Sequence, residues 1–480
     1  MMSRICYILT VLVFLLASCA GGHPDVPQKY VEGSSLPLLY PDYTDVVLPS
    51  NIASPTFMVD DKSVEEVVAE VNYDGKTETF GRGRKVIIGQ KDWNVIRDAS
   101  IGQSIEVTLY TLKSGAWTKH PAFSISIAED DIDPWVSYRL IEPSYVTYNL
   151  IELSQRSLTD YEEITFADNR ATRLTGQTQC LNCHSYQNYK TDNMLYHVRG
   201  KGGGTMLKYK GNSRLMTELK QEGMISNPVY PSWHPTLPLI AFSANKTGQL
   251  FHTQDPAKVE VQDTESHLAL YDIEKDLMIA IDADSTDLET FPTWTPDGKR
   301  IYYTSAHVEE NTQLWMTEHY KDLHYDLYYR DFSEDSHSFG SRNLVLNMSK
   351  QGKSATLPRV SPDGKYLAFA SGEFGCFHIW HRDADINVLN LESMIVDTVP
   401  AVNSTLAESY PTWSSNGRWL FFASRREDGN YSRIYISYFD REGKAHKAFA
   451  LPQPDPEYGR LLMRSYNRPE PMTEPVELFK

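Results

Sequence analysis

Two stretches of sequence decide the fold, FPTWTPDGKRIYYTSA at residues 291–306 and LPRVSPDGKYLAFASG at residues 357–372. Each one predicts a strand, a Pro-Asp-Gly turn and a second strand of apolar and aromatic residues. Two further copies keep this order, YPSWHPTLPLIAFSAN at residues 230–245 and YPTWSSNGRWLFFASR at residues 410–425. The first prolines of the four copies are 61, 66 and 53 residues apart. A strand-built repeat of this length predicts a β-propeller, because one such sheet buries both faces only against neighbouring sheets.

These copies resemble the TolB-like propeller repeat, most closely in TPDGKRIYYTS and SPDGKYLAFAS. The resemblance covers roughly residues 180–450 and implies the fold rather than a function. Two weaker units complete the predicted ring. One begins at Cys183, with KGGG as a hairpin turn, and the other combines the segment after Trp135 with LLMRSYN near the C-terminus. We therefore predict a six-bladed propeller over residues 131–480, with five or seven blades as alternatives.

Residues 51–130 contain short alternating runs such as KVIIGQ, SIEVTLYTL and FSISIAE, which predict a small β-sandwich. Residues 19–50 are rich in Pro, Gly and Ser and predict a tether with little packing of its own. The predicted fold class is therefore all-β, an N-terminal β-sandwich followed by the propeller.

Residues 1–18 predict a lipoprotein signal peptide, because Arg4 precedes an apolar run too short to span a membrane. LASC at residues 16–19 resembles the bacterial lipobox, which implies acylation of Cys19. We expect a lipid anchor in the outer membrane as the only membrane attachment. The periplasmic face is favoured, since AGGHPD after Cys19 is not the acidic stretch that marks surface-exposed lipoproteins in some bacteria. The alternative is an ordinary secretory signal with an incidental cysteine.

The net charge of −17 argues against nucleic-acid binding, because the phosphate backbone would be repelled. The same charge would steer basic protein partners. Of five cysteines, Cys6 leaves with the signal and Cys19 takes lipid, so too few remain for a disulfide scaffold.

The pentad CLNCH, from Cys180 to His184, is typical of covalent haem c attachment. Cys180 and Cys183 would bond the two vinyl groups of the porphyrin, and His184 would bind the iron. A zinc site lacks a second cysteine pair, and a thioredoxin-like redox pair lacks its βαβ context. A short disulfide with an incidental His184 is the remaining alternative.

The candidate sixth iron ligands are Met194 and His197, which lie three apart on a predicted strand and so face opposite sides. Met206, the distant Met472 and an open coordination position are alternatives. The repeat alignment places Cys183 and His184 where the other blades carry SW, TW, RV and TW, which puts the haem near one mouth of the central channel.

These features predict a lipid-anchored envelope haem c protein that takes part in periplasmic electron transfer with a redox partner. The alternative is a non-catalytic TolB-like binding or scaffold propeller, and a haem enzyme ranks third. There is no G-x-S-x-G elbow, zinc-protease motif or P-loop, so we expect an electron carrier or binding protein rather than a hydrolase. A loose group of histidines is predicted to be an exposed loop or edge, with a metal site as the alternative: His307, His319, His324 and His337.

Overall fold

The computed structural model describes residues 23–142, 150–170, 179–200, 203–217, 219–220, 224–281, 286–309 and 318–477. The predicted signal peptide and Cys19 lie outside these ranges. Within them, no helix combines the length and the apolar character needed to cross a membrane. The chain forms two compact units, the first built mainly from Ser54–Ile127 and the second mainly from Ala128–Gln453.

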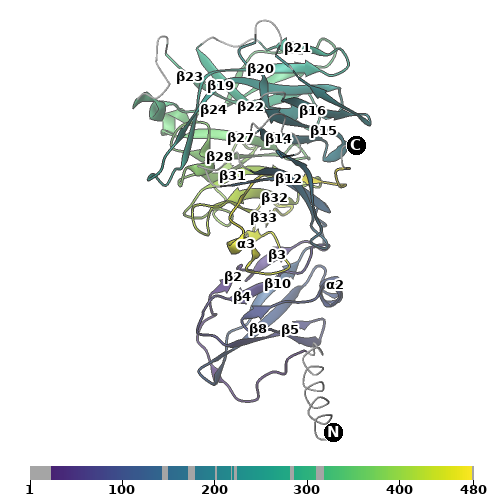
Figure 1. The fold of residues 1–480 in the computed structure, drawn as a ribbon, viewed down its shortest axis with the longest axis vertical. Helices are drawn as coiled ribbons and strands as arrows, with labels where there is room; N and C mark the ends of the chain where they lie inside the picture. Colours follow the sequence, from purple (N-terminus) through teal and green to yellow (C-terminus); the bar gives the residue numbers. More distant parts are fainter. Residues whose placement is uncertain are drawn as a thin grey trace, which may run out of the picture. The chain divides into compact units, whose positions relative to one another are not determined.

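The first unit holds two mainly antiparallel sheets and a helix, and its elements lie in the purple and blue part of Figure 1. The larger sheet contains β1 (Val31–Glu32), β5 (Glu66–Tyr73), β6 (Lys76–Phe80), β8 (Ser104–Lys113), β9 (Ala116–Lys119) and β10 (Phe123–Ile127). The smaller sheet contains β2 (Leu39–Tyr40), β4 (Phe57–Val59) and β7 (Lys85–Val86). The rings of Phe57 and Phe123 meet edge to face at 6.2 Å, so the two sheets pack against each other as a sandwich.

Two parts of the N-terminal region differ from the sequence prediction. Residues 31–48 were expected within a tether, yet they form β1, β2 and β3 (Val46–Leu48), and Tyr43 is fully buried. These strands of two or three residues are too short to show an alternating pattern. The helix α2 (Gln90–Ala99) follows β7 where only strands were expected, and it buries Trp93 and Ile96, which are three residues apart on one helical face.

The second unit contains six antiparallel sheets, five of four strands and one of five. Blade 1 is β11 (Trp135–Ile141), β12 (Ile151–Ser157), β13 (Glu163–Asp168) and β35 (Ser465–Met472); blade 2 is β14 (Cys180–Gln187), β15 (Lys190–Arg199), β16 (Gly204–Tyr209) and β17 (Asn212–Met216); blade 3 is β18 (Pro228–Trp233), β19 (Leu239–Phe251), β20 (Val259–Asp272) and β21 (Leu277–Ala280). Blade 4 is β22 (Asp287–Trp294), β23 (Arg300–His307), β24 (Asp326–Ser333), β25 (Ser338–Phe339) and β26 (Asn343–Leu346); blade 5 is β27 (Ser354–Val360), β28 (Tyr366–Gly372), β29 (Asp385–Asn390) and β30 (Val396–Asp397); blade 6 is β31 (Glu408–Trp413), β32 (Trp419–Ser424), β33 (Arg433–Tyr438) and β34 (Phe449–Ala450). Short helical turns connect some strands: η2 (Glu318–Asp322), η3 (Ser349–Gln351), η4 (His378–Trp380) and α3 (Tyr458–Leu461).

The six blades form a closed ring. Each innermost strand contacts the next one around the ring, in the order β35, β14, β18, β22, β27 and β31, and β31 contacts β35. Blade 1 pairs β11 with β35 from the far end of the chain, which confirms the predicted closure by strands from both ends. The blade count of six is also confirmed. Part of the predicted KGGG turn between β15 and β16, residues 201–202, lies outside the described residues.

The repeated residues shape each blade and join it to its neighbour. Within a blade, the Asp297 carboxylate of the Pro-Asp-Gly turn accepts hydrogen bonds from Thr295 Oγ1 and Lys299 N, and the next residue, Gly298, has a φ of 71°. Only glycine adopts that backbone conformation at little cost. The repeated tryptophans bond neighbouring blades: Trp413 Nε1 donates to the Arg359 carbonyl of blade 5 at 3.0 Å.

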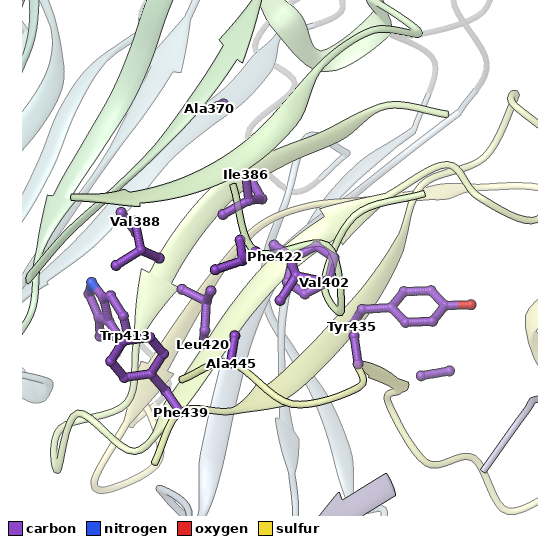
Figure 2. Close-up of a cluster of buried hydrophobic side chains, with 14 residues drawn as sticks. Ala370, Ile386, Val388, Val402, Trp413, Leu420, Phe422, Tyr435, Phe439 and Ala445 are labelled. Atoms are coloured by element: carbon purple, nitrogen blue, oxygen red, sulfur yellow. The ribbon is translucent and has the colours of Figure 1, made fainter. Parts of the chain in front are cut away.

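Figure 2 shows the apolar core between blades 5 and 6, in which Trp413 and Phe439 lie edge to face with ring centres 5.0 Å apart. Residues from both blades, such as Val388 and Leu420, fill the space around them. Burying these faces supplies the hydrophobic stabilisation that no single blade has alone.

Candidate functional site

Each innermost strand passes through one residue with positive φ, and the strand pairing slips there. These residues are Cys183 (57°), Tyr230 (52°), Phe291 (54°), Leu357 (53°), Tyr410 (52°) and Arg468 (52°). The slip is a β-bulge that recurs in all six blades. The residue that follows is His184 in β14 and a proline in the other five strands.

This recurring bulge corrects the predicted alignment of CLNCH. Cys183 and His184 correspond to Tyr230 and Pro231, whereas the sequence analysis placed them at the following SW, TW and RV positions. The dipeptide at residues 185–186 occupies that position instead. The alignment slipped by two residues because β14 lacks the proline that marks the bulge in the other blades.

Two cavities lie at opposite ends of the innermost strands. The start cavity, about 420 Å³, lies near the first residues of four of them, β14, β18, β31 and β35, and its lining includes Cys180 of β14 and Ser465 of β35. The end cavity, about 380 Å³, contacts their last residues, among them Trp233 and Trp413. A ring of bulge residues and prolines lies between the cavities and leaves a space of only about 30 Å³.

The walls of the start cavity include segments outside the blade repeat. The strands β19 and β20 are 13 and 14 residues long, and their far ends contribute Phe251 and Val261 to the wall. The segment around η4 contributes Phe377 and Trp380. The repeat therefore forms the channel, and long strands and insertions enclose one of its ends.

The two cysteines of CLNCH both line the start cavity. Cys180 is half-buried and Cys183 is 2% exposed, and both are free thiols. Burial raises the pKa of the Cys180 thiol, and the charges of Arg139 and Arg199 oppose that shift only in part. Cys180 is therefore a protonated thiol at neutral pH.

His184 is fully buried, and within the described ranges neither of its ring nitrogens makes a well-formed hydrogen bond, although the Ser137 backbone interacts with the ring. Its ring lies edge to face with Tyr186, 6.3 Å between centres. Burial, together with the positive charge of Arg468, lowers the pKa of His184 to about 3, so the imidazole is neutral. Burying a histidine without well-formed hydrogen bonds is costly, and a partner for either nitrogen would lower that cost. His184 is not among the residues that line the start cavity.

The candidate sixth ligands lie on opposite sides of β15, as strand periodicity requires. Met194 is buried in the core shared by blades 1 and 2, together with Met472, and Met206 packs against that core. His197 lies against Phe242 of blade 3, with 6.0 Å between ring centres, and its Nδ1 is 2.8 Å from Thr205 Oγ1. None of these side chains lines the start cavity.

The histidine group at 307–337 does not gather into a metal site in the described part of the chain, where no cluster of three or more His, Cys, Asp or Glu side chains occurs. His307 Nδ1 instead lies 3.0 Å from Asp287 Oδ1, and His337 Nδ1 lies 3.9 Å from Asp272 Oδ2.

Sequence reasoning missed the four arginines of the start cavity: Arg139, Arg199, Arg425 and Arg468. One of them left a signal in the repeat. Arg425 is the last residue of the copy at residues 410–425, where the other three copies carry Asn245, Ala306 and Gly372. A charged residue at a position that is small or neutral in the other copies indicates that Arg425 does more than pack the blade.

No protein-family model and no curated protein matches the chain. Among solved structures, TolB from Acinetobacter baumannii is similar with a TM-score of 0.45 and 13% identity, over 80% of this chain and 85% of that one. An oligogalacturonate lyase from Vibrio parahaemolyticus gives 0.34 and 10%, over 64% and 92%. A puromycin-hydrolysing peptidase from Mycobacterium tuberculosis gives 0.37 and 10%, over 88% and 57%. The chain's own sheets define its class, an all-β protein with an N-terminal sheet unit and a six-bladed propeller.

Proposed function

We propose that this protein is a non-catalytic binding propeller and that the start cavity is its ligand site. The observation that carries the proposal is the composition of the wall, in which arginines and free thiols that occur in single blades, together with aromatic rings, converge on about 420 Å³. Cavities of this size that combine apolar walls with a few polar groups are typical ligand sites.

Iron-free protoporphyrin IX is a suitable probe, added to protein produced without haem attachment and followed by the shift of its absorption band. Val261→Phe fills part of the start cavity, and Val360→Phe is the matched control because Val360 lines the end cavity. We expect Val261→Phe to weaken binding by about tenfold or more, a loss of about 1.4 kcal/mol, with Val360→Phe near wild type. Absence of binding to the wild type, or an effect confined to Val360→Phe, would overturn the proposal.

A second candidate is that the ligand is haem c. Two observations favour it: Cys180 and Cys183 line the same cavity, and the ring nitrogens of His184 make no well-formed hydrogen bond to the part of the chain that the structure describes. Each thiol would add across one vinyl group, forming a C–S bond while its hydrogen goes to the neighbouring carbon, so no oxidant is needed. The haem would supply a redox-active iron held by His184, which would have to turn toward the cavity.

The haem proposal is tested by the pyridine haemochrome spectrum of protein exported in a host with a cytochrome c maturation system. The double variant Cys180→Ala, Cys183→Ala removes both thiols, and Cys376→Ala removes the third free cysteine, which does not line the start cavity. We expect a c-type spectrum that survives denaturation in the wild type and in Cys376→Ala, and none in the double variant. A wild type without haem would leave only the binding propeller.

The cellular role follows as part of the same proposal. Acylation of Cys19 would hold the protein on the periplasmic face of the outer membrane, where a haem-bearing propeller would exchange electrons with a protein partner. Metabolic labelling with palmitate tests the anchor, since Cys19→Ala would abolish incorporation. Labelling that persists in Cys19→Ala would exclude this lipidation site.

A further inference from the structure

We propose that the start cavity selects a dianion, a flat and largely apolar ligand that carries two separate acidic groups. The inference rests on the proposed function, because it assumes that the start cavity is the ligand site. It names the chemical class of the ligand, whether this is a porphyrin with its two propionates or another aromatic diacid.

The charge of the cavity contrasts with the charge of the chain. The whole chain has a net charge of −17, yet four arginines line the start cavity, and Glu142 is the single carboxylate among its described lining residues. A concave surface with this excess of guanidinium groups attracts anions against the overall field of the protein.

Arg425 is a buried cation in the wall of the start cavity. Its side chain is 3% exposed and lies over the Trp380 ring, with the guanidinium carbon 3.4 Å from the ring centre. Nε donates to the Ile379 carbonyl at 2.7 Å and Nη1 donates to the Asn430 carbonyl. Among the described residues, no carboxylate oxygen lies within 4 Å of it. The charge of Asp428 acts on Arg425 from beyond that distance, and the hydrogen bonds of the guanidinium to the described residues all go to carbonyls. A buried cation without a carboxylate in direct contact is expensive, and a ligand acid would relieve that cost.

A second positive group lies on blade 1. Arg139 of β11 donates from Nη1 to Asn182 Oδ1 at 2.9 Å, and the described residues place no carboxylate within 4 Å of it either. Arg468 of β35 shares the Glu470 Oε1 atom with Arg359, at 3.0 and 2.6 Å, so one carboxylate serves two guanidinium groups. Blade 1 and the Arg425 region are different segments of the wall, which is why we infer two acidic groups rather than one.

The remaining wall specifies an apolar body. Phe251, Phe377, Trp380 and Tyr410 present rings to the cavity, with aliphatic side chains such as Val261 among them. Aromatic walls favour a flat ligand. The Arg425 guanidinium, which stacks on the Trp380 ring, would then bind an acidic group at the edge of that ligand.

Protoporphyrin IX and its dimethyl ester test the inference, because they share one ring system and differ in the two carboxylates. Both are titrated against protein that carries Cys180→Ala and Cys183→Ala, which prevents attachment. We expect the ester to bind at least about tenfold more weakly than the acid, as the loss of charge-assisted hydrogen bonds requires. Arg425→Gln and Arg139→Gln should each weaken binding of the acid by about tenfold and leave binding of the ester unchanged.

Arg441→Gln is the matched control, since this arginine is 71% exposed and lies outside the cavity, and it should not change either affinity. If Arg425→Gln does not fold, Arg139→Gln decides the outcome. Equal binding of acid and ester, unchanged by the arginine variants, would refute the dianion and leave the ligand site standing. If neither porphyrin binds the double cysteine variant when all four cavity arginines are present, nor binds the wild type produced without haem attachment, the proposed function fails, and the inference fails with it.

Discussion

The two ends of the propeller channel differ in construction and in chemistry. All six innermost strands line the end cavity, whereas only β14, β18, β31 and β35 among them line the start cavity. The end cavity is lined by residues that recur from blade to blade, such as Trp233, Trp294 and Trp413 with the prolines beside them. Its charged lining residues, Arg359 and Glu470, bond each other at 2.6 Å. The start cavity holds thiols and arginines that occur in single blades.

The difference separates structural residues from functional ones. A residue that every blade needs for packing recurs in every copy of the repeat, whereas a residue that contacts one ligand is needed once. Within one strand, β14 shows both kinds: Ser185 accepts the inter-blade hydrogen bond from Trp233 Nε1 at 3.1 Å, while Cys183 and His184 replace the residues found at the bulge of other blades. The comparison predicts large stability effects at the end cavity and small ones at the start cavity.

The largest effect is expected at a repeated tryptophan. Trp413 is 1% exposed and packs between blades 5 and 6, so Trp413→Ala leaves a void and removes the bond to the Arg359 carbonyl. We expect the free energy of unfolding to fall by about 3–5 kcal/mol, measured by denaturant titration. A loss of unfolding free energy below about 1 kcal/mol would contradict the structural role assigned to the tryptophans of the end cavity.

The next largest effect is expected at Glu470, which bonds both Arg359 and Arg468. Burial acts to raise the pKa of Glu470, but the two arginines outweigh it and hold the pKa below its ordinary value. Its charge therefore stabilises the fold above the unfolded-state pKa, and that stability is lost as the pH falls through the folded pKa. Glu470→Gln should cost about 3 kcal/mol at pH 7 and reduce the acid sensitivity of unfolding. Equal stability of variant and wild type at pH 7 would contradict this.

A smaller and pH-dependent effect is expected at His184, where five blades carry proline. His184→Pro should leave stability at pH 8 within about 1 kcal/mol of wild type, because proline follows the same positive-φ residue in every other blade. The folded pKa of about 3 lies below the ordinary value of 6.5, so wild-type stability is complete above pH 6.5 and falls as the pH drops toward 3.

The variant should remove a slope of about 1.4 kcal/mol per pH unit in that range. Thermal melts of the haem-free protein from pH 8 to pH 5 measure it. A variant that is unfolded at pH 8 would show that β14 does not share the bulge of the other blades.

The smallest effect is expected at the start cavity itself. Arg139 is half-buried, and the side-chain hydrogen bond that it makes to the described residues goes to Asn182. Arg139→Gln should change the free energy of unfolding by less than about 1 kcal/mol while weakening porphyrin binding. Comparable losses of stability from Arg139→Gln and Trp413→Ala would erase the distinction between the two ends.

The sequence supported the fold further than the site. Four repeat copies and the closure of blade 1 by residues 465–472 were predictable, because strand packing imposes a period that is visible along the chain. The ligand-site arginines were not, since Arg139, Arg425 and Arg468 come together only through the ring closure. The position of His184 directly after the bulge was not predicted either, because the residue types around Cys183 do not indicate its positive φ.

The porphyrin titration of Val261→Phe beside Val360→Phe tests the central claim most directly, since the two substitutions are identical and fill opposite ends of one channel. We expect a dissociation constant about tenfold higher for Val261→Phe than for Val360→Phe. Equal constants, or weaker binding in Val360→Phe, would contradict the assignment of the start cavity as the ligand site.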